Sequence, residues 1–117
     1  MDIPQQVQDK LAQFQNLQQQ LQLITLQKQQ LMVGGGDIDN ALAELEKLER
    51  EGKVYMAAGM LLIESSKAES EKTLKEQKEL NETRMKVLEK QEKKLSEKYE
   101  ELKKEIQAIL KQKKEAG

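Results

Sequence analysis

The sequence predicts a mainly α protein: a long antiparallel two-helix coiled coil, joined by a short β-hairpin that forms part of an oligomeric β-barrel hub. Three observations support this fold class. Charged residues make up 35% of the 117 residues and aromatic residues only 3%, a composition typical of long helices. Two segments carry apolar residues at heptad spacing. Between them lies one window with the residue types of β-strands.

The composition also limits the chemistry that the chain can perform. It has no histidine and no cysteine, which removes the commonest general base, the commonest metal ligand and all thiol chemistry. We therefore expect no enzyme, no cofactor and no metal site. A net charge of −1 gives nucleic acid no electrostatic attraction. No apolar run approaches the ~20 residues of a membrane span, and residues 1–5 do not resemble a signal peptide, so we expect a cytoplasmic protein without membrane contact.

The first helix is expected over about residues 5–49. Pro4 suits the first turn of a helix, because the missing N–H would have no partner there. Apolar residues follow at alternating steps of three and four, although Lys28 occupies one expected position. The members of this seam are Phe14, Leu17, Leu21, Ile24 and Leu31. Such spacing makes a helix supercoil with a partner.

Three consecutive glycines, residues 34–36, interrupt this helix-forming sequence. Leu31 and Ile38 stand seven residues apart across them, so the heptad phase continues and predicts one helix with a weak point. The alternative is a junction between two helices, with Gly34 as a C-cap and Asp37 or Asp39 as an N-cap.

A β-hairpin is expected over about residues 53–64. Val54 and Tyr55 favour a strand, Gly59 favours a turn, and an aliphatic run follows. Gly52 is the candidate C-cap of the preceding helix. A continuous, buried helical turn is the alternative for this window.

The second helix is expected over about residues 66–114. Ser66 and Glu69 have the spacing of a capping box. Lys78, Asn81 and Glu92 are polar intrusions into its heptad seam, which otherwise consists of Leu74, Met85, Leu88, Leu95, Tyr99, Leu102, Ile106 and Ile109. Folding back would bring Leu45 near Leu74 and Phe14 near Leu102.

Two surfaces of this architecture are expected to need partners. An isolated hairpin is marginally stable in water and has open edges, so its strands should assemble into a hub. Its candidate residues are Val54, Tyr55, Met56, Leu61, Leu62 and Ile63. At the far tip, frayed helix ends should leave apolar residues partly exposed, and these residues could bind other polypeptide chains without sequence specificity. Ordinary seam packing with frayed ends is the alternative for this tip, whose residues are Ile3, Val7, Leu11, Phe14, Ile106, Ile109 and Leu110.

Several stretches of the chain resemble the archaeal prefoldin β subunit. They are IPQQVQ at residues 3–8, LQQQLQ at 17–22, Val54-Tyr55 followed by Gly59, and Lys90-Gln91-Glu92. The resemblance spans nearly the whole chain. It implies a hexamer of two α-type and four β-type subunits, with this chain as a β-type subunit. It also implies ATP-independent capture of unfolded polypeptides at the tips and their delivery to a group II chaperonin.

Carried over by position, the resemblance places client contact on the tip residues named above and assembly on the hairpin. Chaperonin contact is expected near Lys111, Lys113 and Lys114. The three glycines depart from the family pattern, which has polar helix formers there, and this puts the stiffness of the helix in doubt. The competing function is a structural coiled-coil scaffold or tether that binds no clients.

Overall fold

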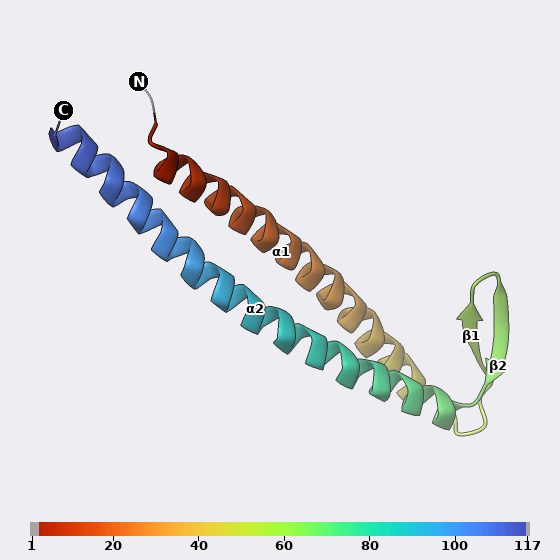
Figure 1. Cartoon of the computed structure of the whole chain (residues 1–117). Helices are drawn as coiled ribbons and strands as arrows, with labels where there is room; N and C mark the ends of the chain where they lie inside the picture. The colour runs from red at the N-terminus through yellow and green to blue at the C-terminus, as the bar shows by residue number, and fades with distance from the viewer. Residues whose placement is uncertain (1–2, 117) are drawn as a thin grey trace. The chain divides into compact units, whose positions relative to one another are not determined.

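The computed structural model of the chain describes residues 3–116. It contains α1 (Gln5–Glu46), β1 (Val54–Ala58), β2 (Leu61–Ser65) and α2 (Lys67–Ala116), in that order (Figure 1). The expected class, two long helices with a short antiparallel hairpin between them, is therefore confirmed.

The chain forms two compact units. The terminal unit contains Met1–Lys28 and Val87–Gly117, and the hairpin unit contains Gln29–Lys86. In the terminal unit, the first part of α1 lies antiparallel to the last part of α2, with Lys10 paired to Glu105 and Lys28 paired to Glu92. In the hairpin unit, the remaining part of α1 and the first part of α2 pack together beside the β-hairpin.

Both ends of α1 have backbone partners outside the regular ladder. The Pro4 carbonyl accepts the first helical hydrogen bond, from the Gln8 N–H at 3.0 Å. At the other end, the Leu48 N–H reaches back only three residues, to the Leu45 carbonyl at 3.1 Å. This tighter turn ends the helix at Glu46, three residues before the expected position 49. The Lys67 ammonium then donates to the carbonyl of Leu48, two residues beyond the end of the helix, at 2.9 Å.

The three glycines lie inside α1, which continues unbroken through them. The two-helix alternative for residues 34–36 is therefore wrong. Gly52, the predicted C-cap, lies outside the helix in a turn, where its N–H donates to the Glu49 carbonyl at 2.8 Å.

The β-hairpin has a two-residue connection, Gly59 and Met60, because Ala58 pairs with Leu61. Gly59 has a φ of 60°, and no other described residue has a positive φ. One positive φ at the first connecting position is the pattern of a type II′ turn, which matches the twist of paired strands and favours glycine there. The helical alternative for this window is wrong.

The start of α2 is capped as the sequence predicted. The Glu69 N–H donates to the Ser66 hydroxyl at 3.1 Å, and the Ser70 N–H donates to the Ser66 carbonyl at 2.9 Å. Ser70 is only 4% exposed, and its hydroxyl lies 3.1 Å from that of Ser65. These contacts join the end of β2 to the first turn of α2.

The apolar core follows the heptad seams. In the terminal unit the buried residues are Val7, Ile24, Leu102 and Ile106, and in the hairpin unit Leu45 is buried. Phe14 stacks on Tyr99 with ring centroids 4.4 Å apart, one turn from the expected neighbour Leu102. Leu45 and Leu74 line the same cavity beside the hairpin, as folding back predicted. The core is thus a narrow strip between two helices.

Candidate functional site

The predicted tip residues all lie in the terminal unit, but they differ in exposure. Val7 is 1% exposed and Ile106 is 7% exposed, so both belong to the closed seam. The expectation that these two side chains are partly exposed is therefore wrong. The physical reason is that the heptad packing continues to the first turn of α1, so each side chain is covered by the facing helix.

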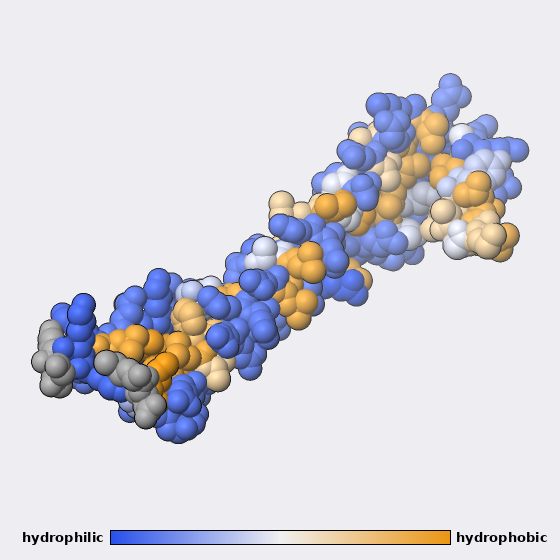
Figure 2. Space-filling view, turned by 90° about the horizontal axis from the view of Figure 1, so that it is seen from above, coloured by the Kyte–Doolittle hydropathy of each residue, from blue (hydrophilic) through white to orange (hydrophobic). Residues whose placement is uncertain are grey.

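An exposed apolar surface nevertheless remains at this tip. Ile3 is 47% exposed and Leu110 is 48% exposed. Half-buried side chains adjoin them along the seam: Leu11, Phe14 and Ile109. Figure 2 shows apolar side chains gathered beside the grey terminal residues, with hydrophilic side chains around them. We call this set, Ile3, Leu11, Phe14, Ile109 and Leu110, the tip surface.

Polar contacts hold the backbone beneath the tip surface. The Lys10 ammonium lies 2.6 Å from the Glu105 carboxylate and joins the two helices. The Gln8 side-chain amide donates to the Ile3 carbonyl at 2.8 Å, which fixes the segment before α1. The tip surface is therefore an apolar patch with a polar frame, and no described group in it has the geometry of an acid–base pair.

The three lysines expected to contact a chaperonin lie on the last described turns of α2. Lys111, Lys113 and Lys114 are all exposed. Cations near the C-terminus of a helix also interact favourably with its dipole. Lys113 and Lys114, which lie in the last turn of α2, can therefore also stabilise the end of the helix.

The hairpin unit carries the second predicted surface. Met56 pairs with Ile63 across the strands, and Ala57 pairs with Leu62, so consecutive pairs put apolar side chains on both faces of the ribbon. The exposed members are Tyr55, Met56, Leu61, Leu62 and Ile63, whereas Val54 is half-buried. Within the described residues the sheet has only these two strands, so both outer edges are unpaired. Figure 2 shows this second apolar surface.

Sequence reasoning missed two residues. Met60 is fully exposed in the hairpin turn, and its position directly after the turn glycine Gly59 was the available signal. Tyr99 belongs to the tip through its stack on Phe14, but only the register of the two helices reveals that partner.

Two further features are absent from the described residues. No group of three or more acidic side chains there could hold a metal ion. In the same part of the chain, neither helix contains a stretch apolar and long enough to cross a membrane.

The sequence of the chain matches a known family of proteins. The family model for the prefoldin subunit matches residues 8–113. This chain belongs to the prefoldin family. The prefoldin subunit β of Thermococcus onnurineus is 43% identical over 109 residues, which cover 93% of this chain and 94% of the relative. The prefoldin subunit β of Archaeoglobus fulgidus is 41% identical over the same length and covers 93% and 94%, respectively.

A solved structure has the same fold as this prefoldin-family chain. The crystal structure of the prefoldin β subunit from Thermococcus strain KS-1 superposes with a TM-score of 0.83 at 42% identity. The match covers 93% of this chain and 96% of that chain. Family membership gives the chain a prefoldin chaperone role, assembled with other prefoldin subunits, and points to a non-enzymatic protein.

Proposed function

We propose that the chain captures unfolded polypeptides through the tip surface, without ATP, and delivers them to a group II chaperonin. The observation that carries this proposal is the exposure of Ile3 and Leu110 next to half-buried apolar neighbours. An unfolded chain exposes apolar side chains that a folded protein buries. A shallow apolar patch can cover such side chains without requiring a particular sequence.

A single tip surface of this size would bind weakly. Two exposed side chains and three half-buried ones offer little area, and an unfolded client loses conformational entropy when it is held. Several tips on one assembly overcome this cost, because each contact after the first is intramolecular. The proposal therefore includes a hexamer of two α-type and four β-type subunits.

The hairpin is the proposed assembly element. Its apolar side chains on two faces and its unpaired edges favour pairing with hairpins of other subunits into a β-barrel hub. Such a barrel would remove both edges and cover the exposed leucines. The proposed partners are an α-type subunit and further copies of this chain.

The test of client capture uses two substitutions within the tip surface. The I3S/L110S variant removes the exposed apolar side chains and leaves the buried Val7 and Ile106 in place. The parent and the variant are each assembled with an α-type subunit and added to a denatured client diluted into buffer without ATP. Light scattering then reports aggregation. We expect the parent to suppress aggregation and I3S/L110S to lose most of that suppression.

The matched control is L23S. Leu23 lies on the same helix in the same unit and is 55% exposed, but it is not part of the tip surface. We expect L23S to protect the client as well as the parent does. Equal protection by I3S/L110S and the parent would reject tip capture and favour the structural scaffold or tether. These substitutions are sharper than truncation, because removing buried Val7 and Ile106 would also weaken the helix pair.

Delivery to the chaperonin is proposed to use Lys111, Lys113 and Lys114 against an acidic surface. We expect K111Q/K114Q to weaken chaperonin binding at low salt and to reduce its dependence on ionic strength. The K103Q/K104Q variant, with two other exposed lysines of α2, is the charge-matched control. Equal binding by the two variants would contradict this assignment. Delivery requires a shared compartment, so a cytoplasmic location belongs to the same proposal.

A further inference from the structure

The three glycines of the hairpin unit do not occupy equivalent positions. Gly35 stands seven residues after Lys28 and seven before Leu42, in the seam that faces α2. Apart from its chain neighbours and the nearby backbone of its own helix, a β-carbon built on Gly34 or Gly36 would meet no atom within 4 Å. A β-carbon on Gly35 would lie 2.9 Å from the Asn81 side-chain nitrogen, closer than unbonded carbon and nitrogen atoms pack. Of the three glycines, only Gly35 therefore lies where an added methyl group would have to displace a neighbouring side chain, that of Asn81.

The Asn81 side chain uses the space that Gly35 leaves. Its amide nitrogen donates a hydrogen bond to the Leu31 carbonyl at 2.9 Å, and this bond is partly buried. In a regular helix the same carbonyl also accepts the N–H of residue 35, four positions later. A carbonyl oxygen has two lone pairs, so it can accept both donors. Asn81 thus bonds directly to the backbone of the opposite helix.

This bond lies where α1 is intrinsically weakest. Glycine has more backbone freedom in the unfolded chain than any other residue, so three in succession favour local opening of the helix. The Leu31 carbonyl is at the N-terminal side of this weak segment, one turn before Gly35. A hydrogen bond from α2 at this point is lost when the segment opens, and it therefore opposes opening.

We propose that Asn81 acts as a clasp on α1, holding residues 31–36 helical, and that the missing side chain of Gly35 makes the clasp possible. Gly35 then helps to hold the helix closed by making room for Asn81, whereas Gly34 and Gly36 only lower the stability of the helix. Local opening at this point of α1 is controlled by one side chain of the opposite helix. This inference does not depend on client capture or on assembly.

The experiment is a double-substitution cycle on the full chain, read out by amide hydrogen exchange at residues 32–37. Exchange is expressed as protection factors, which remove the intrinsic difference between glycine and alanine. We expect N81A to lower protection about fivefold, the loss typical of one hydrogen bond. N81D keeps the shape but cannot donate when ionised, and we expect at least the same loss at neutral pH.

Glycine substitutions separate the clasp from ordinary helix propensity. G34A and G36A are the matched controls, and each should raise protection about fivefold because alanine favours helix. G35A should raise protection much less in the parent, since its methyl group displaces Asn81. In the N81A background, however, G35A should give the full fivefold gain. If G35A matches G34A and G36A in the parent, or if N81A and N81D leave protection unchanged, the clasp does not exist.

Discussion

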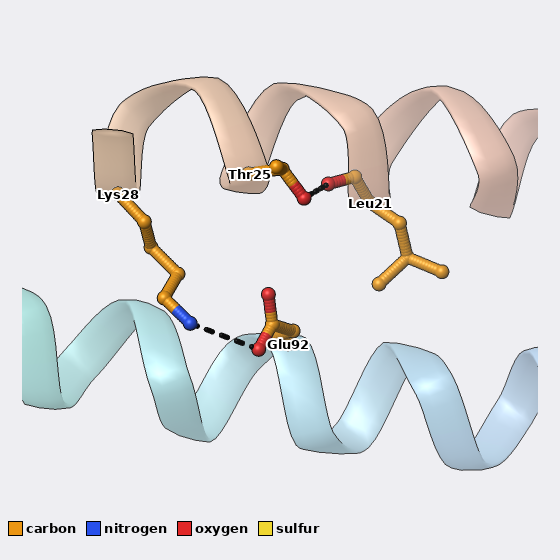
Figure 3. A network of polar contacts seen from close by, with 4 residues as sticks. All are labelled: Leu21, Thr25, Lys28 and Glu92. Atoms are coloured by element: carbon orange, nitrogen blue, oxygen red, sulfur yellow. Dashed lines mark hydrogen bonds and ion pairs between the residues drawn. The ribbon is translucent and has the colours of Figure 1, made fainter. Parts of the chain in front are cut away.

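The Lys28 ammonium lies 3.1 Å from the Glu92 carboxylate, and both side chains occupy seam positions where the heptad pattern expects apolar residues (Figure 3). Lys28 is 25% exposed and Glu92 is 33% exposed. The pair therefore links the two helices of the terminal unit through a site that water reaches only in part. An ion pair in such a place contributes little net stability, because desolvation offsets the attraction between the charges.

Replacing both members of this pair by leucine is expected to stabilise the terminal unit. The K28L/E92L variant restores an apolar seam, whereas K28L or E92L alone leaves one charge without its partner. We expect each single substitution to lower the unfolding free energy by about 1–2 kcal/mol, and the double variant to equal or exceed the parent. Urea unfolding of the parent and the three variants measures these unfolding free energies. A double variant less stable than the parent would contradict this prediction.

The sequence predicted the parts of this fold that depend on spacing. The step from Leu31 to Ile38 predicted a helix through the glycines, and Ser66 with Glu69 predicted the start of α2. Gly59 predicted the turn of the hairpin. In each case the physical cause is local, because heptad phase, capping and a positive φ involve residues close together in the chain.

The sequence predicted the axial register of the two helices only to within about one turn, since Phe14 stacks on Tyr99 and not on Leu102. Lys28, Asn81 and Glu92 were visible as polar intrusions, but their partners depend on which turns of the helices face each other. The burial of Val7 and Ile106 also depends on this register. A turn of the opposite helix covers each of these side chains, which we expected the frayed helix ends to expose. A shift of one turn changes all of these contacts without changing the heptad pattern.

The stacking of the Phe14 and Tyr99 rings should contribute more to the unfolding free energy than the hydrogen bond of the Tyr99 hydroxyl does. The rings are 4.4 Å apart and 22° from parallel, whereas the Gln18 amide lies 3.4 Å from the hydroxyl, a long and weak hydrogen bond. We expect F14A to lower the unfolding free energy by about 2 kcal/mol and Y99F by less than about 0.5 kcal/mol. Thermal unfolding of both variants checks this order, and a larger loss in Y99F would reverse the argument.

A charge on the hairpin should prevent assembly without unfolding the helices. Leu62 is 73% exposed, so L62K costs little in the isolated chain, but a partner strand would have to bury the added ammonium. We expect at least about tenfold weaker assembly with an α-type subunit and an unchanged helical circular dichroism signal. Analytical ultracentrifugation measures the size of the assembly that each protein forms with the α-type subunit.

The control for this hairpin variant is L80K, a change at another exposed leucine of the same unit, 51% exposed on α2. Because Leu80 is outside the hairpin, L80K should assemble like the parent. Full assembly of L62K would mean that the hairpin face is not covered by a partner.

The ion pair between Lys78 and Asp39 should make the hairpin unit sensitive to alkaline pH. The Lys78 ammonium lies 2.9 Å from the Asp39 carboxylate. The hydrogen bond and charge of Asp39, with a smaller effect of Glu82, raise the pKa of Lys78 above its ordinary value of 10.5, although desolvation opposes this rise. A lysine with a raised pKa in the folded state holds its proton more tightly there than in the unfolded chain.

The pair therefore stabilises the fold fully below pH 10.5, and this contribution disappears as the pH rises through the higher pKa of folded Lys78. We expect the parent to exceed D39N in stability by a constant amount between about pH 7 and pH 9, with the difference shrinking above pH 10.5. Comparing the two proteins cancels the titration of the tyrosines and other lysines, which both contain. Urea unfolding across this pH range measures the difference, and a gap that stays constant to pH 12 would show that the ion pair does not stabilise the folded state.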